Sequence, residues 1–116
     1  MSKRTDREFL LDMQEAIRRI TDYTEQMTYQ AFLKDTRTQD AVVRNLEIIG
    51  EAAKKLTKDL RERHTAVPWR SMAAIRDRLI HHYFGVNLDI VWQIVVEELP
   101  KVATQLDRIL REENNS

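Results

Sequence analysis

The sequence predicts an all-α protein, folded as an antiparallel up-down four-helix bundle. Glycine and proline number only two each among 116 residues, whereas Leu, Ala, Ile, Glu and Arg are abundant, so little interrupts helix formation. Apolar residues also recur every three or four positions along four long stretches, a spacing that places them on one helix face. Four such helices with modest connections bury their apolar faces by packing as a bundle.

The first predicted helix covers about 6–27. Its apolar stripe consists of Phe9, Met13, Ala16, Ile17, Ile20, Tyr23 and Met27. Residues 28–35 are expected to form a short helical turn, followed by a polar break at 36–38. The second helix is expected to open at Thr38 or Gln39. Its heptad-like stripe consists of Val42, Leu46, Ile49, Ala53 and Leu56.

Gly50 interrupts the second helix at a cost of about 1 kcal/mol relative to alanine. We interpret it as a point where another helix packs closely. Glu51 lies off the stripe and is expected to be solvent-exposed, with no catalytic role. The third helix follows a connector at 59–67 and begins at or just after Pro68, whose missing N–H costs nothing there. It is expected to end at 83–85, with Gly85 as its C′ residue.

The fourth helix is expected to be capped by Asn87 or Asp89, and Pro100 should bend or divide it. Its stripe consists of Val91 or Trp92, Val95, Leu99, Val102, Leu106 and Ile109 or Leu110. The single domain covers 1–116, with 112–116 as a polar tail. Four apolar residues lie off the main stripes and predict self-association as a two-fold dimer: Val43, Ile48, Ile90 and Ile94.

Charge and composition narrow the class of protein. Nineteen basic residues balance nineteen acidic ones, so any polyanion must bind a local basic patch, at 54–63 or 70–82. The first patch is interpreted as a solvated helix end, with cations near the negative pole of the helix. The chain has no cysteine, no signal-peptide pattern and no apolar run of membrane-spanning length. We therefore expect a soluble cytoplasmic protein.

Residues 76–83 contain two arginines, two histidines, an aspartate and a tyrosine within the last turns of the third predicted helix. Arg76 projects into the middle of an apolar arc. The arc consists of Trp69, Met72, Ala73, Ile75, Leu79, Ile80 and Tyr83. A charge on such a face is costly unless it is paired. Arg76 therefore either has a buried partner or lines a cleft that binds an anion.

Arg76 and His81 are five residues apart, about 140° around a regular helix, so they cannot grip one phosphate without help. A helix end that unwinds around His81, or a second copy of the motif across a dimer interface, would bring them together. A metal site is not expected, because His81 and His82 point about 100° apart and His64 lies in another segment.

The spacing of Arg76, His81 and Tyr83 resembles the Arg-x4-His-x-Tyr motif of the HEPN-domain toxins, specifically the HepT-like group. Asp77 fits the polar position that often follows the arginine. Three further blocks resemble the family in the same order, and they cover most of the domain: 41–53 (Ala-Val-Val-Arg-Asn-Leu-Glu-Ile-Ile-Gly-Glu-Ala-Ala), 67–70 (Val-Pro-Trp-Arg) and 83–92 (Tyr-Phe-Gly-Val-Asn-Leu-Asp-Ile-Val-Trp).

This resemblance implies a HEPN-like bundle that dimerises with its two motifs facing one cleft. It also implies the toxin of a toxin–antitoxin pair, acting as a metal-independent endoribonuclease without a cofactor. His81 would activate the ribose 2′-OH or protonate the leaving 5′-oxygen, and Arg76 would stabilise the phosphorane-like transition state. The expected product is a 2′,3′-cyclic phosphate. Asp77 and Arg78 would support these two catalytic residues.

The implied partner is a minimal nucleotidyltransferase antitoxin that transfers AMP to Tyr83. Adenylyl groups beside Arg76 would fill the cleft and add negative charge where RNA phosphate must lie. Two alternatives remain open from the residues. One is a non-catalytic HEPN adaptor that binds a nucleotide, RNA or the nucleotidyltransferase. The other is a purely structural role for Arg76 as a satisfied core charge.

Overall fold

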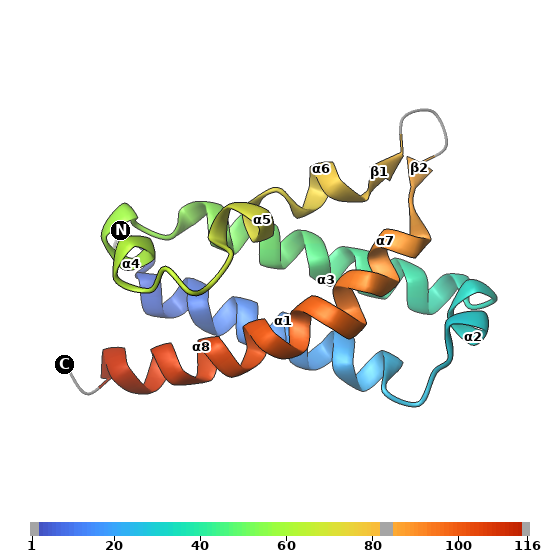
Figure 1. The fold of residues 1–116 in the computed structure, drawn as a ribbon, viewed down its shortest axis with the longest axis horizontal. Helices are drawn as coiled ribbons and strands as arrows, with labels where there is room; N and C mark the ends of the chain where they lie inside the picture. The colour runs from blue at the N-terminus through green and yellow to red at the C-terminus, as the bar shows by residue number, and fades with distance from the viewer. Residues whose placement is uncertain (1–2, 82–84, 115–116) are drawn as a thin grey trace.

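The computed structural model describes residues 3–81 and 85–114, without the side chains at 81 and 114 (Figure 1). Its helices are α1 (Asp6–Thr24), α2 (Tyr29–Leu33), α3 (Thr36–Lys55), α4 (Lys58–Arg63), α5 (Trp69–Ala73), α6 (Ile75–Leu79), α7 (Leu88–Gln93) and α8 (Leu99–Asn114). A π-helical segment, Ile94–Glu98, joins α7 to α8, and two short strands, β1 (Ile80–His81) and β2 (Gly85–Val86), follow α6. The mostly helical structure confirms the all-α class.

The long helices lie side by side along the molecule (Figure 1). α1 packs against α3 and α8, while α5 and α6 pack on the opposite side of α3. α7, the π-helical segment and α8 follow one another as a continuous rod. Within the described residues, no helix is long and apolar enough to cross a membrane.

Side-chain caps set the starts of α1 and α3. Thr5 and Glu8 form a capping box at α1, each accepting a hydrogen bond from the other's backbone N–H. Asp35 caps α3 by accepting from the Thr38 N–H (3.0 Å) and the Thr38 hydroxyl (2.8 Å). The expected polar break at 36–38 is therefore wrong, because Asp35 lets the helix begin at Thr36. α1 ends at Thr24, three residues earlier than predicted.

The third predicted helix is divided, which corrects its expected end at 83–85. Pro68 precedes its first residue as predicted, but Ala74 separates α5 from α6 with φ −90° and ψ 7°. At Ile80 the backbone becomes extended (ψ 128°), and β1 pairs with β2 in an antiparallel hairpin. Gly85 has φ +80°, a conformation that favours glycine, but it lies in β2 and is not a helix C′ residue.

The last rod changes its hydrogen-bonding pattern at Ile94–Glu98, whereas Pro100, which was expected to bend or divide the helix, is the second residue of α8. Asn87 caps α7 by accepting from the Ile90 N–H at 3.2 Å. The Leu99 N–H then donates to the Ile94 carbonyl, five residues back, which is the bond of a π-helix. α8 continues to Asn114, so the expected polar tail at 112–116 begins inside the helix.

The predicted stripe of the second helix is entirely buried. Two predictions about exposed and buried apolar residues are corrected. Tyr23 is 41% exposed, because Thr24 and not Tyr23 faces the core near the end of α1. Ile94 is fully buried in the core, whereas Val43, Ile48 and Ile90 are partly buried. Ile94 is therefore not part of a surface left for a dimer partner.

Candidate functional site

Arg76 is exposed on α6, so the prediction that it projects into the core is wrong. Ile75 and Leu79 occupy the buried face of this short helix, which turns Arg76 outward. Ile80, also predicted on the buried arc, is 53% exposed. Arg76 makes no ion pair or side-chain hydrogen bond within the described part of the chain. The interpretation of Arg76 as a satisfied core charge is therefore excluded.

Arg76 lines a cavity of about 210 Å³ between α3 and the α5–α6 segment. Two further cations, Arg44 and Lys54, and two carboxylates, Glu47 and Glu51, line the same cavity. Lys54 pairs with Glu51 at 3.5 Å, whereas neither Arg44 nor Arg76 has an ion-pair partner among the described residues. The cavity thus presents two uncommitted guanidinium groups, as the cleft interpretation of Arg76 requires.

Gly50 forms part of this cavity because α5 lies close to α3. A Cβ atom placed on Gly50 would lie 3.3 Å from the carbonyl oxygen of Met72. This contact is tighter than a side chain normally makes, which confirms the interpretation of Gly50 as a close-packing position. Glu51 is exposed at 58% of its side chain, as predicted.

Arg78 is held in a polar contact between segments. Its guanidinium donates two hydrogen bonds to the Glu98 carboxylate, at 2.9 and 2.5 Å, and a third to the Ser71 hydroxyl at 2.8 Å. About a third or less of each ionic side chain is exposed, 28% for Arg78 and 32% for Glu98. Arg78 therefore fixes α6 against α5 and the π-helical segment, while its neighbour Asp77 is exposed.

His81 lies on an extended backbone, because α6 ends two residues before it. The Asn87 N–H donates to the Leu79 carbonyl at 2.7 Å and closes the base of the hairpin. The angle of about 140° on a straight helix therefore does not apply. The helix end is unwound at His81, which is one of the two arrangements expected to bring Arg76 and His81 together. The His81 side chain, and residues 82–84 with His82 and Tyr83, lie outside the described residues.

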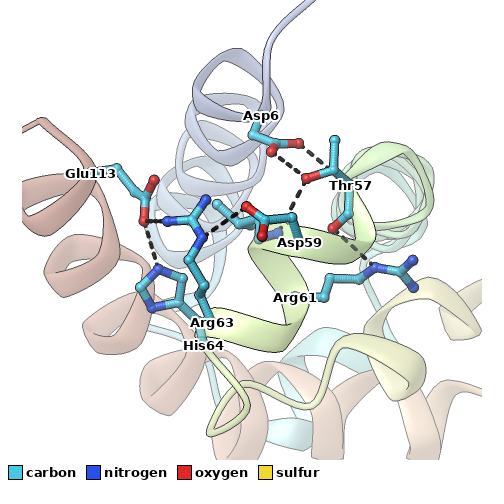
Figure 2. Close-up of polar contacts among 8 residues, drawn as sticks. Asp6, Thr57, Asp59, Arg61, Arg63, His64 and Glu113 are labelled. Atoms are coloured by element: carbon cyan, nitrogen blue, oxygen red, sulfur yellow. Dashed lines mark hydrogen bonds and ion pairs between the residues drawn. The ribbon is translucent and has the colours of Figure 1, made fainter. Parts of the chain in front are cut away.

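Arg61 and Arg63 of the basic patch at 54–63 belong to a second polar cluster (Figure 2), around α4, which lies at the opposite end of the molecule from the β1–β2 hairpin (Figure 1). Arg63 contacts Asp59 at 3.0 Å and also Glu113, and His64 lies 2.8 Å from the same Glu113 carboxylate oxygen. These contacts hold the pKa of Glu113 below its ordinary value, with the His64 hydrogen bond as the largest cause and Arg63 as the next favourable one.

Asp6 links α1 to the same end by accepting from the backbone N–H and hydroxyl of Thr57, at 2.9 and 2.6 Å (Figure 2). The basic residues of the patch are exposed, and two further intrahelical contacts, Lys54 to Glu51 and Lys58 to Glu62, compensate its charge. The interpretation as a solvated helix end fits the part of the patch at 58–63, whereas Lys54 and Lys55 line cavities beside α3.

Arg44 is the cavity residue that the sequence pattern did not identify. It lies off the apolar stripe of α3. Its position in the helical pattern does not distinguish it from an ordinary solvent-exposed arginine. Only Gly50, six residues further on, signalled that another element approaches this face of α3.

Comparison with known proteins identifies the family of the chain. The family model described as Ribonuclease HepT-like matches residues 13–109. The protein named "Putative RNase" in Methanocaldococcus jannaschii is 46% identical over 112 residues, which cover 97% of this chain and 93% of that protein. The "Probable ribonuclease HepT" of Thermococcus cleftensis is 42% identical over 107 residues, covering 92% and 97% of the two chains.

No solved structure matches the chain. The family match spans α1 from Met13, the whole of the cavity around Arg76 and most of α8. Together with relatives of similar length, this match establishes the family of the chain. The structure shows separately that Arg76 is exposed in the cavity and has no ion-pair partner among the described residues. The chain belongs to the HepT-like ribonuclease family.

Proposed function

We propose that this protein is a metal-independent endoribonuclease and the toxin of a toxin–antitoxin pair, with Arg76 and His81 as its catalytic residues. One observation carries the proposal. Arg76 is exposed in a cavity with Arg44, and neither has an ion-pair partner among the described residues. A guanidinium that no carboxylate neutralises is available to bind a phosphodiester.

The reaction needs no group beyond the RNA, the protein and solvent water. The ribose 2′-oxygen attacks the neighbouring phosphorus. His81 either takes the 2′-OH proton while solvent water protonates the leaving 5′-oxygen, or protonates that oxygen while water takes the 2′-OH proton. The bond between phosphorus and the 5′-oxygen breaks, giving a 2′,3′-cyclic phosphate and a free 5′-hydroxyl. Arg76 stabilises the extra negative charge of the phosphorane, which is where a preorganised cation lowers the barrier most.

Cleavage of RNA by the purified protein in excess chelator tests this proposal. Arg76→Ala and His81→Ala should each lower the rate by about 10²-fold or more. Arg108→Ala is the matched control, since Arg108 is an exposed arginine of α8. Its rate should equal that of the unaltered protein. Equal background cleavage in all four proteins, with unchanged melting temperatures, would instead support the non-catalytic adaptor.

We propose further that a nucleotidyltransferase antitoxin controls the site by adenylylating Tyr83. Tyr83 lies two residues after His81, so an adenylyl group there would place negative charge beside the proposed catalytic pair. Co-expression with such a nucleotidyltransferase should add whole AMP masses to the peptide containing Tyr83. The Tyr83→Phe variant should gain none, and an unmodified Tyr83 peptide under these conditions would rule out this control.

The active form is proposed to be a homodimer whose two motifs share one cleft. Ile80 and Val86, which pair across the hairpin next to the motif, are 53% and 40% exposed. Apolar side chains at this position offer a contact for a second copy close to Arg76.

A further inference from the structure

Arg44 stands where three cavities meet on the outer face of α3. The first is the cavity of about 210 Å³ that contains Arg76. The second, about 260 Å³, reaches Val86 of β2 and Leu88 of α7. The third, about 610 Å³, lies between α3 and the start of α1. Arg44 and Glu47 line all three, so these cavities lie next to one another beside α3.

The largest of these three cavities has the make-up of a nucleotide-binding surface. Its floor contains the apolar side chains of Phe9, Ile48 and Ala52. Lys3 and Lys55 line it, and neither has an ion-pair partner in the part of the chain that the structure describes. Sites for single-stranded nucleic acid combine aromatic or apolar surfaces for bases with cations along the backbone. The volume also falls within the range of pockets that hold a ligand.

Arg4, a further cation of this cavity, is already committed. It lies 2.7 Å from Asp12 and 3.5 Å from Glu8, with its guanidinium 4.8 Å from the centre of the Phe9 ring. Arg44 has no such contacts among the described residues. It is therefore the arginine of this cavity best able to bind an incoming anion.

We propose that Arg44 binds the RNA phosphate next to the scissile one, so that the flanking nucleotide lies in the cavity between α1 and α3. The inference rests on the proposed function, because it places the scissile phosphate at Arg76. Arg44 lines both the cavity of Arg76 and the larger one, so one extended strand can pass from one guanidinium to the other. Arg44 is then a substrate-binding residue outside the sequence motif.

Glu47 opposes this binding and gives the inference a second test. Its carboxylate lines the same three cavities and has no ion-pair partner in the described ranges. A negative charge beside a phosphate path weakens RNA binding. Glu47→Gln should therefore raise RNA affinity, whereas Arg44→Ala should lower it. Opposite effects at neighbouring positions cannot both come from a general loss of folding.

The experiment measures binding of a single-stranded RNA with a 2′-O-methyl group on every ribose, which this chemistry cannot cleave. Dissociation constants are taken over a range of salt concentrations. Arg44→Ala should weaken binding about tenfold and lower the slope of log K against log salt by about 0.7, the value of one phosphate contact. Arg44→Lys should retain the slope. Arg37→Ala, an exposed arginine of the same helix outside the three cavities, is the matched control.

Cleavable RNA separates this inference from the proposed function. If both hold, Arg44→Ala raises KM by a larger factor than it lowers kcat. If the unaltered protein binds RNA through Arg44 but never cleaves it, the proposed function fails and the phosphate contact survives. If RNA is cleaved but Arg44→Ala leaves affinity, KM and salt slope unchanged, the inference is overturned. A changed oligomeric state with an unchanged slope would likewise overturn it, by assigning Arg44 to a protein interface.

Discussion

The two ends of this molecule use the same types of side chain in opposite ways. Where α4 meets the end of α8, Arg63 and His64 both contact Glu113, and Asp59 also contacts Arg63 (Figure 2). At the α6 end, Arg76 is exposed in a cavity with no ion-pair partner among the described residues. An arginine near a histidine therefore indicates an anion site only where carboxylates do not already neutralise the cation.

The same contrast recurs within the motif itself. Arg78, two residues after Arg76, forms a two-bond ion pair with Glu98 and also contacts Ser71. One arginine holds the short helix in place, and the other is left available to a ligand.

Arg78→Ala tests this division of roles and should have the largest effect on stability. Loss of charge-assisted hydrogen bonds at a half-buried site should lower the free energy of unfolding by about 2 kcal/mol. Arg76→Ala, the matched control on the same helix, should change it by less than about 0.5 kcal/mol. Denaturant unfolding measures both. Equal losses in the two variants would remove the distinction between them.

Glu113→Gln tests the cluster at the other end through its pH dependence. The pKa of Glu113 is lower in the folded protein than its ordinary value of 4.5, so its carboxylate adds stability above that pH. The contribution is lost as the pH falls through the lowered pKa. Unfolding at pH 7 should show a loss of about 1 kcal/mol in the variant, and this difference should shrink below pH 4.5.

Glu112→Gln is the control for that experiment. Glu112 is 3.9 Å from His64, but 56% of its side chain is exposed, so its removal should change stability little at either pH. A difference between Glu113→Gln and the unaltered protein that stayed constant down to pH 2 would contradict the assignment of the effect to the carboxylate.

Ile80→Thr should have the smallest effect on the stability of the folded chain. It tests whether the hairpin beside Arg76 forms the dimer interface. Because Ile80 is 53% exposed, the substitution should change the free energy of unfolding of one chain by less than about 0.5 kcal/mol. In the proposed dimer it should nevertheless weaken self-association, as measured by sedimentation. Leu11→Gln, at a 38% exposed position of α1, should not. An unchanged dissociation constant for Ile80→Thr would remove the hairpin from the interface.

Periodicity predicted the long helices well because their burial follows local spacing. The core residues of α3 and the cap at Asn87 agree with the sequence, whereas the π-helical segment before Pro100 was not expected. The division at Ala74 and the extended backbone at Ile80 could not be predicted. No glycine or proline lies between 69 and 84, so local propensity favours a continuous helix.

Contacts between segments that are distant in the sequence accompany the break between α5 and α6. Ile75 and Leu79 are buried, and Arg78 reaches Glu98, twenty residues later. Because the predicted helix was continuous, its spacing wrongly placed Arg76 in the middle of the apolar arc. The family resemblance identified Arg76 as a candidate, but the role of Arg44 depends on how α1, α3 and α6 lie relative to one another. Such a role has no local signature in the chain.

The π-helical segment makes the position of the motif depend on a single residue. A π turn holds about one residue more than the α-helical turn it replaces. Deleting one residue there would restore ordinary helical bonding and rotate the preceding α7 by about 100° relative to α8. α7, which packs against α6, would then present a different face to it, and the surface beside Arg76 would lose part of its support. The position of Arg76 is thus sensitive to insertions and deletions in a segment about twenty residues further along the chain.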